Sequence, residues 1–412
     1  MKIQEIAEIN NLKMNILMIS QEYPADDLEK EFTPVVHFFT KEWVAMGHEV
    51  RVINCPSNFP ALYYTFAKPF RRRLESRWGL NIRMYRATKR IYDLDGVPVI
   101  RIPLCKYRPH GKFSKHEIKR SIKETIAFCN ETDFTPDIIV GHWSNPAVEM
   151  MIGLKKQYNV KTALVMHDDG PDFRSIFKKE CRDYIDSINI WGFRSPTIQR
   201  DFESYYGKMR NTFICYSGVP ASFVNKNVTR TFNSTSKYLF VGLLMKRKYP
   251  FELVKALEMS NEKDFSLSII GEGAEKNTIE SYLADKPNLS QRVHLLGRVS
   301  RDEVSRRMQD SDVFCMISKD ETFGLVYLEA MAAGCITIAS RDEGFDGIIV
   351  NGENGFLCEA GNTEELITII NHINEMSSTE LLQMSQKAIE TAKEMTDEKV
   401  AQTYINNLIK YM

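Results

Sequence analysis

The sequence predicts an α/β protein built from two Rossmann-like domains that face each other across a cleft. Three observations favour this fold class. The chain has 412 residues, which suits two domains of roughly 200 residues each better than one ordinary core. Short apolar runs alternate with longer helical patterns, as expected for buried parallel strands joined by helices. This alternation stops at a polar segment in the middle of the chain and then begins again.

In the first half, apolar strand candidates are separated by helical patterns. The first strand is expected at Asn15–Ser20, followed by a helix over Val35–Met46. Later strands are expected at Glu49–Ile53, Val97–Pro103, Asp137–Gly141, Lys161–Met166, Ser187–Trp191 and Thr212–Tyr216. Met14 directly precedes the first strand, so residues 1–13 are interpreted as a short extension or a start-site artefact. A first domain is predicted over residues 14–216.

The polar segment at residues 217–236 is rich in Ser, Thr and Asn, which predicts a linker. Strand candidates return at residues 238–242, 265–271, 292–297, 312–318 and 335–340. A second domain is therefore predicted over residues 237–395. The tail Lys399–Met412 has apolar side chains at helical spacing, so a helix over about 396–412 is expected to pack back on the first domain.

Composition and charge narrow the class of protein. Hydrophobic residues make up 43% and charged residues 26%, as in soluble globular proteins. The eight cysteines are scattered without metal-ligand spacing, which favours reduced thiols in a cytoplasmic protein. Residues 1–220 hold 33 Lys and Arg against 26 Asp and Glu, and the remainder holds 21 against 28. Either each half meets a different partner, or the halves attract each other across the cleft.

The most informative stretch is Ser318–Ser340, which reads SKDETFGLVYLEAMAAGCITIAS. If a helix begins near Gly324, Glu321 lies in the preceding loop and Glu329 in the second turn. The first N–H groups of that helix would form an anion site suited to a diphosphate, and a carboxylate can accept hydrogen bonds from ribose hydroxyls. These residue types alone also fit an ordinary capped helix with exposed glutamates.

The stretch resembles the signature of family 4 retaining glycosyltransferases with the GT-B fold, which is E-x7-E running into EAMAxG. Four flanking segments resemble the family's phosphate-binding segment, glycine turn, base-contacting strand end and following loop: Val241–Lys248, Ile269–Gly273, Leu295–Val304 and Glu343–Cys358. The resemblance is strong over about 237–370 and weaker, but in register, over 14–220.

The resemblance implies the roles of individual residues. Glu321 would lie beside the transferred sugar, and Glu329 would bind the donor ribose. The diphosphate would be held by the backbone of Gly324, Leu325 and Val326 and neutralised by Lys248, and Arg298 and Val299 would flank the base. Leu243 stands where the family usually has Arg. Lys246 or Arg247 could replace that cation, or both could be solvated surface charges.

In the first half, two histidines follow strand candidates. His142 matches the family histidine that approaches the donor sugar, so it is predicted to be catalytic together with Glu321. His167 resembles a neighbouring strand-end histidine and is expected to act as a hydrogen-bonded support. The loop after the first strand lacks the glycine pair of the family, and Thr33 is a candidate to serve in its place.

The implied activity is transfer of a hexose-type sugar from a UDP- or GDP-sugar to a glycan or lipid-linked acceptor, in cell-surface polysaccharide biosynthesis. No metal or other cofactor is expected, because Asp93 and Asp95 stand in a turn rather than in a metal-binding context. Two other functions stay open: a nucleotide-sugar 2-epimerase-like isomerase, and a catalytically silent module that binds nucleotide sugars.

A basic stretch, residues 67–90, contains nine Lys or Arg and one Glu, with aromatic residues between them. It fits a solvated helix face, an anionic membrane surface, or the diphosphate of a lipid-linked acceptor. Nucleic acid is not expected, because no nucleic-acid motif accompanies it. The expected location is cytoplasmic, with peripheral contact at the inner face of the membrane.

Overall fold

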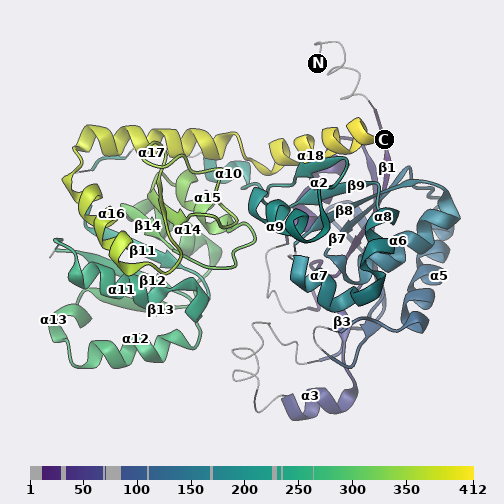
Figure 1. The fold of residues 1–412 in the computed structure, drawn as a ribbon, viewed down its shortest axis with the longest axis horizontal. Coiled ribbons are helices and arrows are strands. Elements are labelled where there is room, and N and C mark those ends of the chain that lie inside the picture. Colours follow the sequence, from purple (N-terminus) through teal and green to yellow (C-terminus); the bar gives the residue numbers. More distant parts are fainter. Residues whose placement is uncertain are drawn as a thin grey trace. The chain divides into compact units, whose positions relative to one another are not determined.

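The computed structural model describes residues 12–28, 34–67, 70, 85–108, 111–167, 170–224, 230–232, 235–262 and 264–412. The chain forms two compact units, each with its own sheet (Figure 1). The first unit comprises the described residues up to Arg194, together with Ile198–Cys215 and Asp397–Met412. The second comprises Ser195–Thr197 and Tyr216–Thr396, so the predicted linker at 217–236 falls inside it.

The first unit contains an eight-stranded sheet in the order β10-β9-β8-β7-β1-β2-β5-β4. The strands are β1 (Asn15–Ser20), β2 (Glu49–Asn54), β4 (Arg90–Leu94), β5 (Val97–Arg101), β7 (Ile138–His142), β8 (Lys161–Met166), β9 (Ile190–Phe193) and β10 (Thr212–Ile214). All neighbours are parallel except β4 and β5. Short strands β3 (Ser57–Asn58) and β6 (Leu104–Cys105) pair separately.

The helices of the first unit connect these strands and cover the sheet. They are α2 (Val35–Ala45), α3 (Ala61–Ala67), α5 (Lys115–Glu131), α6 (Ser144–Tyr158), α7 (Gly170–Phe177), α8 (Cys181–Ser187), α9 (Pro196–Tyr206) and α18 (Asp397–Tyr411), with a 3₁₀ turn, η2, at Lys178–Glu180. Leu17, Ile139 and Leu164 from the central strands are fully buried in the core. Strands buried on both faces explain why the sequence shows continuous apolar runs here.

The C-terminal helix α18 belongs to the first unit, as the helical spacing of the tail predicted. It lies beside α2, and both helices are labelled in Figure 1. The indole N–H of Trp43 donates to the carbonyl of Ala401 at 3.1 Å, and Tyr404 and Leu408 are buried. The apolar stripe of the tail therefore forms part of this core.

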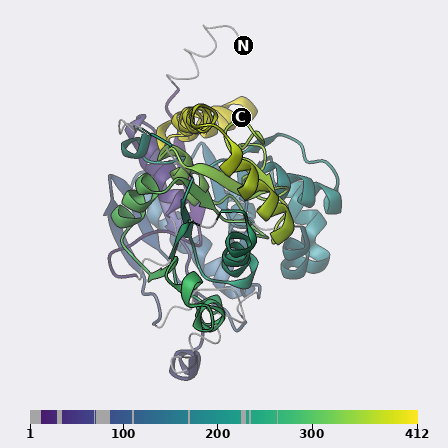
Figure 2. The same ribbon diagram turned by 90° about the vertical axis from the view of Figure 1, so that its left-hand side faces the viewer.

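The second unit contains a six-stranded, entirely parallel sheet in the order β13-β12-β11-β14-β15-β16. The strands are β11 (Lys237–Val241), β12 (Ser266–Ile270), β13 (Val293–Gly297), β14 (Val313–Cys315), β15 (Ile336–Ser340) and β16 (Phe356–Cys358). The helices of this unit, drawn in green and yellow in Figure 2, surround the sheet.

The helices of the second unit are α10 (Ala221–Val224), α11 (Pro250–Met259), α12 (Glu275–Ala284), α13 (Pro287–Ser290), α14 (Arg301–Asp310), α15 (Leu325–Ala332), α16 (Thr363–Glu375) and α17 (Ser378–Lys393), with a 3₁₀ turn, η3, at Lys246–Lys248. Several begin at side-chain caps: Ser300 accepts from the N–H of Glu303, and Ser377 forms a capping box with Glu380.

Both sheets have the Rossmann strand order, in which the chain turns back at one point and ligands bind beyond the carboxyl ends of the strands there. In the first unit this switch point lies between β1 and β7, and in the second between β11 and β14. The α/β class with two Rossmann-like domains, predicted from the sequence, is confirmed.

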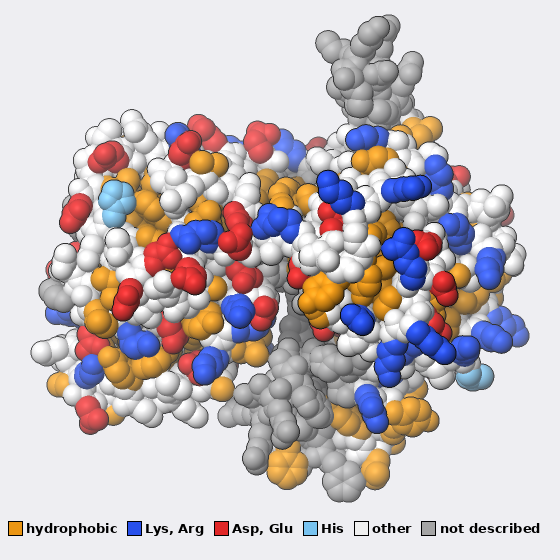
Figure 3. Space-filling view, viewed as in Figure 1, with side chains coloured by type: hydrophobic (Ala, Val, Ile, Leu, Met, Phe, Trp, Pro, Cys, Tyr) orange, Lys and Arg blue, Asp and Glu red, His pale blue; other side chains and the backbone are white. Residues whose placement is uncertain are grey.

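The charge asymmetry of the sequence is visible on the surface in Figure 3, where Lys and Arg are abundant on the first unit, on the right, and acidic side chains gather on the second. Among the helices of the described residues, none is both long enough and apolar enough to cross a membrane.

Candidate active site

The switch point of the second unit brings two connections together at one edge of its sheet. The connection after β11 runs from Gly242 to the 3₁₀ turn η3, and the connection after β14 runs to Gly324 at the start of α15. The N–H of Lys319 donates to the carbonyl of Arg247 at 2.7 Å, which ties the two connections directly. The E-x7-E stretch therefore lies where parallel α/β sheets bind ligands.

The glycine turn after β12 makes close backbone packing possible beside this edge. A side chain at Gly271 would place its Cβ 1.8 Å from the carbonyl oxygen of Gly242, and one at Gly273 would lie 2.3 Å from that of Leu244. The N–H of Leu244 donates to the carbonyl of Glu272 at 2.9 Å. Only glycine allows this approach, which fixes the course of the chain after β11.

The N-terminus of α15 is built as an anion site. Gly324, the N-cap residue, has a φ of 84°, and no side chain caps the helix. A Cβ at this position would meet the ring of Tyr327 at 2.4 Å. Leu325 and Val326, which open the helix, are half-buried. Uncapped N–H groups and the positive end of the helix dipole favour a negatively charged ligand here.

Lys248 and Glu321 form an ion pair beside this helix start. Each side chain is only 13% exposed. The hydroxyl of Ser318 donates to the same carboxylate oxygen of Glu321 at 3.3 Å. The pair joins η3 to the loop before α15, so a cation and a carboxylate stand together next to uncapped N–H groups.

The loop that carries Glu321 is held by Glu343, which follows β15. The N–H of Glu321 donates to the Glu343 carboxylate at 2.8 Å. Burial raises the pKa of Glu343, and the nearby charges of Asp320 and Glu321 raise it further, whereas backbone hydrogen bonds from those two residues lower it. The next residue, Gly344, packs so closely that a Cβ there would lie 2.3 Å from the carbonyl oxygen of Glu321.

Glu329 lies on α15 and is 9% exposed. Its carboxylate accepts from the guanidinium of Arg301, the first residue of α14, at 2.6 Å. The Arg301 side chain is 46% exposed and also lies 5.3 Å from the ring centre of Phe223. Any ligand hydroxyl that binds Glu329 must share or replace this ion pair.

The remaining residues predicted to bind the donor differ in their surroundings. Arg247 donates to the carbonyls of Lys319 at 3.1 Å and Asp320 at 3.2 Å, so its guanidinium braces the loop after β14. Lys246 and Arg298 are exposed, as is Leu243, whereas Val299 packs against the core. Of the basic residues predicted to bind the donor, Lys248 is the one whose side chain pairs with a glutamate of the E-x7-E stretch.

The switch point of the first unit contains His142, the last residue of β7. The side chain is completely buried, and both ring nitrogens have partners. Nδ1 lies 3.0 Å from Nε2 of His167, and Nε2 lies 3.3 Å from the hydroxyl of Tyr404 on α18. His142 could touch a sugar only if one of these partners moved, and its catalytic role stays a prediction.

The two histidines are held in their neutral forms. Burial lowers the pKa of His142 well below its ordinary value, and the positive charge of Arg194 lowers it further. The pKa of His167 is lowered by burial, by Arg194 and by His142. The ring of Trp143 stacks on His167 with 4.0 Å between ring centres. Trp143 has a φ of 60°, a strained conformation often found at functional sites.

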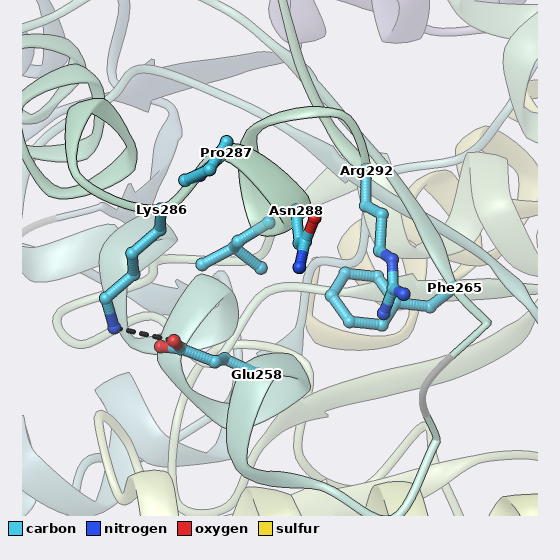
Figure 4. A pocket seen from close by; sticks show the side chains of 7 residues that line it. Glu258, Phe265, Lys286, Pro287, Asn288 and Arg292 are labelled. Atoms are coloured by element: carbon cyan, nitrogen blue, oxygen red, sulfur yellow. Dashed lines mark hydrogen bonds and ion pairs between the residues drawn. The ribbon is translucent and has the colours of Figure 1, made fainter.

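Two sequence predictions fall on residues outside the described ranges. Thr33 is one, and most of the basic stretch at 67–90 is the other. A pocket of about 280 Å³ in the second unit lies elsewhere, at the amino-terminal edge of the sheet, near Phe265 and Arg292 before β12 and β13 (Figure 4). There Lys286 pairs with Glu258 at 2.6 Å. This pocket is at the opposite end of the strands from the E-x7-E stretch.

Among the described residues, no group of three or more His, Cys, Asp or Glu side chains is arranged to hold a metal ion. Sequence reasoning missed three residues of the site: Arg301, Ser318 and Glu343. Ser318 and Glu343 stood within segments of the resemblance, but their contacts depend on how the loops fold back. Arg301 also stood within a segment of the resemblance, Leu295–Val304, but its contact with Glu329 joins two separate helices and leaves no local pattern.

The chain is similar to known glycosyltransferases in sequence. Residues 224–395 match the model of the family described as glycosyl transferases group 1. An uncharacterized glycosyltransferase of Methanocaldococcus jannaschii is 34% identical over 153 residues, covering 37% of this chain and 41% of that protein. A D-inositol 3-phosphate glycosyltransferase of Corynebacterium urealyticum is 24% identical over 330 residues, 69% of this chain and 76% of that protein. The chain spans 26–41% of the length of the first three curated relatives it matches.

Solved structures share the fold over nearly the whole chain. HepE of Anabaena in complex with UDP has a TM-score of 0.67 at 16% identity, covering 96% of this chain and 100% of that one. The apo form of the lipopolysaccharide outer core galactosyltransferase WaaB has a TM-score of 0.69 at 16% identity, covering 97% and 100%. The fold is the GT-B fold expected from the sequence.

Proposed function

We propose that this chain is a glycosyltransferase that moves a hexose-type sugar from a UDP- or GDP-sugar to a glycan or lipid-linked acceptor, with retention of configuration and without a metal ion. The family match over most of the second unit supports the reaction class. The glycosyltransferase names of the relatives and the UDP complex of HepE support a nucleotide-sugar donor. The name of WaaB supports a role in cell-surface polysaccharide assembly.

One observation carries the proposal: an uncapped helix N-terminus at a Rossmann switch point stands beside the ion pair of Lys248 and Glu321. The N–H groups at Leu325 and Val326 suit the diphosphate of the donor, and Lys248 supplies a fixed positive charge to it. Charge that develops on a departing diphosphate is stabilised by such preorganised groups. Glu329 binds the ribose hydroxyls in this proposal, and Arg298 and Val299 flank the base.

The transfer step follows from these roles. The bond between the anomeric carbon and the diphosphate oxygen breaks, and the acceptor oxygen bonds to the same face of that carbon. The acceptor hydroxyl gives its proton to the departing diphosphate oxygen. Glu321 orients the sugar and stabilises its positive charge, and Glu343 positions Glu321 through the loop backbone. His142, neutral in this structure, keeps its predicted catalytic role in the proposal.

Two other functions make different predictions. An isomerase acting on the nucleotide sugar would convert the donor without any acceptor. A silent binding module would bind nucleotides without releasing sugar, and exposed Leu243 in place of a phosphate-binding arginine favours that alternative. In the proposal, Lys248 compensates for this missing arginine. The proposal also includes a cytoplasmic location, with peripheral contact to an anionic membrane through residues 67–90.

The first test is thermal stabilisation of the full chain by nucleotides and nucleotide sugars, with EDTA present. Binding to the folded state raises the melting temperature according to ligand concentration over Kd. A shift with UDP or GDP compounds that is lost in Glu329→Ala, but kept in the control Glu353→Ala on an exposed turn of the same unit, supports the donor site. No shift with any nucleotide contradicts the proposal.

The second test is release of sugar from the donor. Slow hydrolysis or transfer that is retained with EDTA and falls at least 100-fold in Glu321→Gln supports the transferase. Conversion of the donor to an isomeric nucleotide sugar supports the isomerase, and binding with neither reaction supports the silent module. Activity abolished by EDTA and restored by a divalent ion contradicts the metal-independent part of the proposal.

A further inference from the structure

Lys106 is a buried lysine without a charged partner in the described part of the chain. Lys106 follows β6, and the residue is only 7% exposed. Its N–H donates to the carbonyl of Asn58 at 2.9 Å, and its ammonium lies 5.3 Å from the ring centre of Phe113. Among the described residues, no hydrogen bond or ion pair engages the ammonium. A buried unpaired charge is costly, so this arrangement calls for an anion.

A neighbouring lysine of the same unit has both ion-pair and hydrogen-bond partners. Lys112, six residues later, pairs with Glu149 at 3.1 Å and with Glu180 at 2.6 Å, and donates to the hydroxyl of Tyr184 at 3.1 Å. Burial lowers the pKa of Lys106 to about 8, and the charge of Glu22 opposes that shift. Lys112 has two carboxylate partners, whereas the Lys106 ammonium has a ring contact and forms no ion pair with any described residue.

Two buried side-chain oxygens of the first unit also lack hydrogen-bond partners among the described residues. Oδ1 of Asn54 and Oδ1 of Asn145 accept no hydrogen bond from any described residue. Asn54 is 1% exposed and Asn145 is 7% exposed. Their amide nitrogens are engaged: Asn54 donates to the carbonyls of Ser20 and Gln21, and Asn145 to that of Gly111. Both oxygens can accept from hydroxyl groups.

Two of these groups lie near the switch point of the first sheet, and Lys106 follows the short strand β6, which pairs with β3 beyond the ends of β2 and β5. Ser20, at the end of β1, stands in register with Asn54 of β2 and with His142 of β7. Asn145 follows three residues after His142. The segment 111–113 contacts both Asn145 and Lys106. The carbonyl of Gly111 accepts a hydrogen bond from the Asn145 amide, and the ring of Phe113 lies against the Lys106 ammonium. Ligands of Rossmann-like sheets bind at this edge.

We propose that Lys106, Asn54 and Asn145 bind the acceptor through an anionic group, a carboxylate or a phosphate, on a part of the acceptor that also bears hydroxyls. The Lys106 ammonium pairs with the anionic group, and the two asparagine oxygens accept from the hydroxyls. This assignment rests on the proposed transferase function, and it adds the chemical class of the acceptor to it.

The test uses glucose, glucuronate and glucose 6-phosphate, which share a hydroxyl-bearing ring and differ in the charged group. Acetate and inorganic phosphate supply the anion without the hydroxyls. Binding to the full chain is measured by isothermal titration with UDP or GDP present, for wild type, Lys106→Met, Asn145→Ala and Lys119→Met. Lys119 is an exposed lysine on α5 of the same unit and serves as the matched control.

Glucuronate or glucose 6-phosphate should bind wild type and Lys119→Met at least tenfold more tightly than glucose and than the simple anions. Lys106→Met should remove the preference for the charged sugar, and Asn145→Ala should remove the preference over the simple anion. The tighter of the two charged sugars identifies the carboxylate or the phosphate as the group. A second measurement guards against misfolding, because each variant must keep the circular dichroism spectrum of wild type.

Equal binding of all three sugars by wild type overturns the proposal, and so does an unchanged preference in a folded Lys106→Met variant. Absence of binding by every probe overturns it as well. Failure of the donor site is a separate outcome, because it appears as absence of nucleotide binding to wild type before any acceptor probe is added.

Discussion

Lys248 and Glu321 form an ion pair that joins two different connections of one sheet, η3 after β11 and the loop after β14. Each side chain is 13% exposed. The pair therefore has two effects: it sets the position of the carboxylate that is proposed to lie next to the transferred sugar, and it holds the cation beside the start of α15. Removing one partner leaves the other partly buried and unpaired, which costs more than removing both.

We therefore expect Lys248→Met and Glu321→Gln to be strongly coupled in stability. Each single change should lower the free energy of unfolding of the second unit by about 1–3 kcal/mol. The double variant should lose at least 1 kcal/mol less than the sum of both. Urea unfolding of the four proteins in the double-mutant cycle measures the coupling. If the losses in the free energy of unfolding are additive, the interaction between the two side chains does not contribute to stability.

Arg301 forms an ion pair with Glu329, the residue whose carboxylate is proposed to bind the donor ribose. Partly exposed ion pairs contribute roughly 0.2–1 kcal/mol. If the nucleotide must displace Arg301, Arg301→Ala should bind UDP or GDP roughly 1.4- to fivefold more tightly at low salt, since 1.4 kcal/mol is tenfold. The gain should shrink at high salt, because salt weakens the competing pair in wild type. Titration calorimetry at two salt concentrations measures this.

The control for Arg301→Ala changes another arginine of the same helix. Arg306→Ala on the same helix removes an arginine that pairs with Glu303 and lies on the exposed surface, and it should leave nucleotide affinity unchanged. Weaker nucleotide binding in Arg301→Ala would show that Arg301 contacts the nucleotide rather than competing with it.

Much of the fold was predictable because its strands are buried on both faces. Asn15–Ser20 and Lys161–Met166 were predicted at their observed bounds. The three-residue strand β16 was not predicted, because it is too short to leave an apolar pattern. The antiparallel strand β4 was not predicted either, because its alternate residues are exposed and two of its five side chains, Arg90 and Asp93, are charged.

The site was predictable where the sequence encodes local geometry, and not where it depends on tertiary contacts. A helix start near Gly324 was part of the sequence interpretation, and α15 begins at the next residue, Leu325. The bond between Glu321 and Glu343 joins residues from two separate loops. The burial of His142 depends on Tyr404, 262 residues away on the C-terminal helix. No local pattern in the sequence contains either relationship.

Gly344 is expected to be irreplaceable in the loop that holds Glu321. A Cβ there would lie 2.3 Å from the Glu321 carbonyl oxygen and 2.5 Å from the nitrogen of Phe323, both backbone atoms. Gly344→Ala should therefore cost about 1–3 kcal/mol of stability and displace the loop. Gly242→Ala is the control, because its Cβ would meet no atom closer than 3.5 Å. Thermal unfolding compares them, and an equal, small loss in both would contradict the packing argument.

The buried histidine pair predicts how the first unit responds to acid. The pKa of both His142 and His167 is lowered in the folded chain by burial and by Arg194, so the unfolded chain binds more protons as the pH falls below about 6.5. Stability should then be fully present above that pH and be lost on acidification, by up to about 1.4 kcal/mol per pH unit for each histidine.

His142→Gln removes one titrating group and keeps a side chain able to bond to His167 and Tyr404. Between pH 7 and pH 5, the free energy of unfolding of the first unit should therefore fall less steeply in this variant than in wild type. His116→Gln, an exposed histidine on α5, should retain the wild-type slope. Urea unfolding across this range measures both. If His142→Gln keeps the wild-type slope, His142 titrates alike in the folded and unfolded chain and is not held neutral by its surroundings.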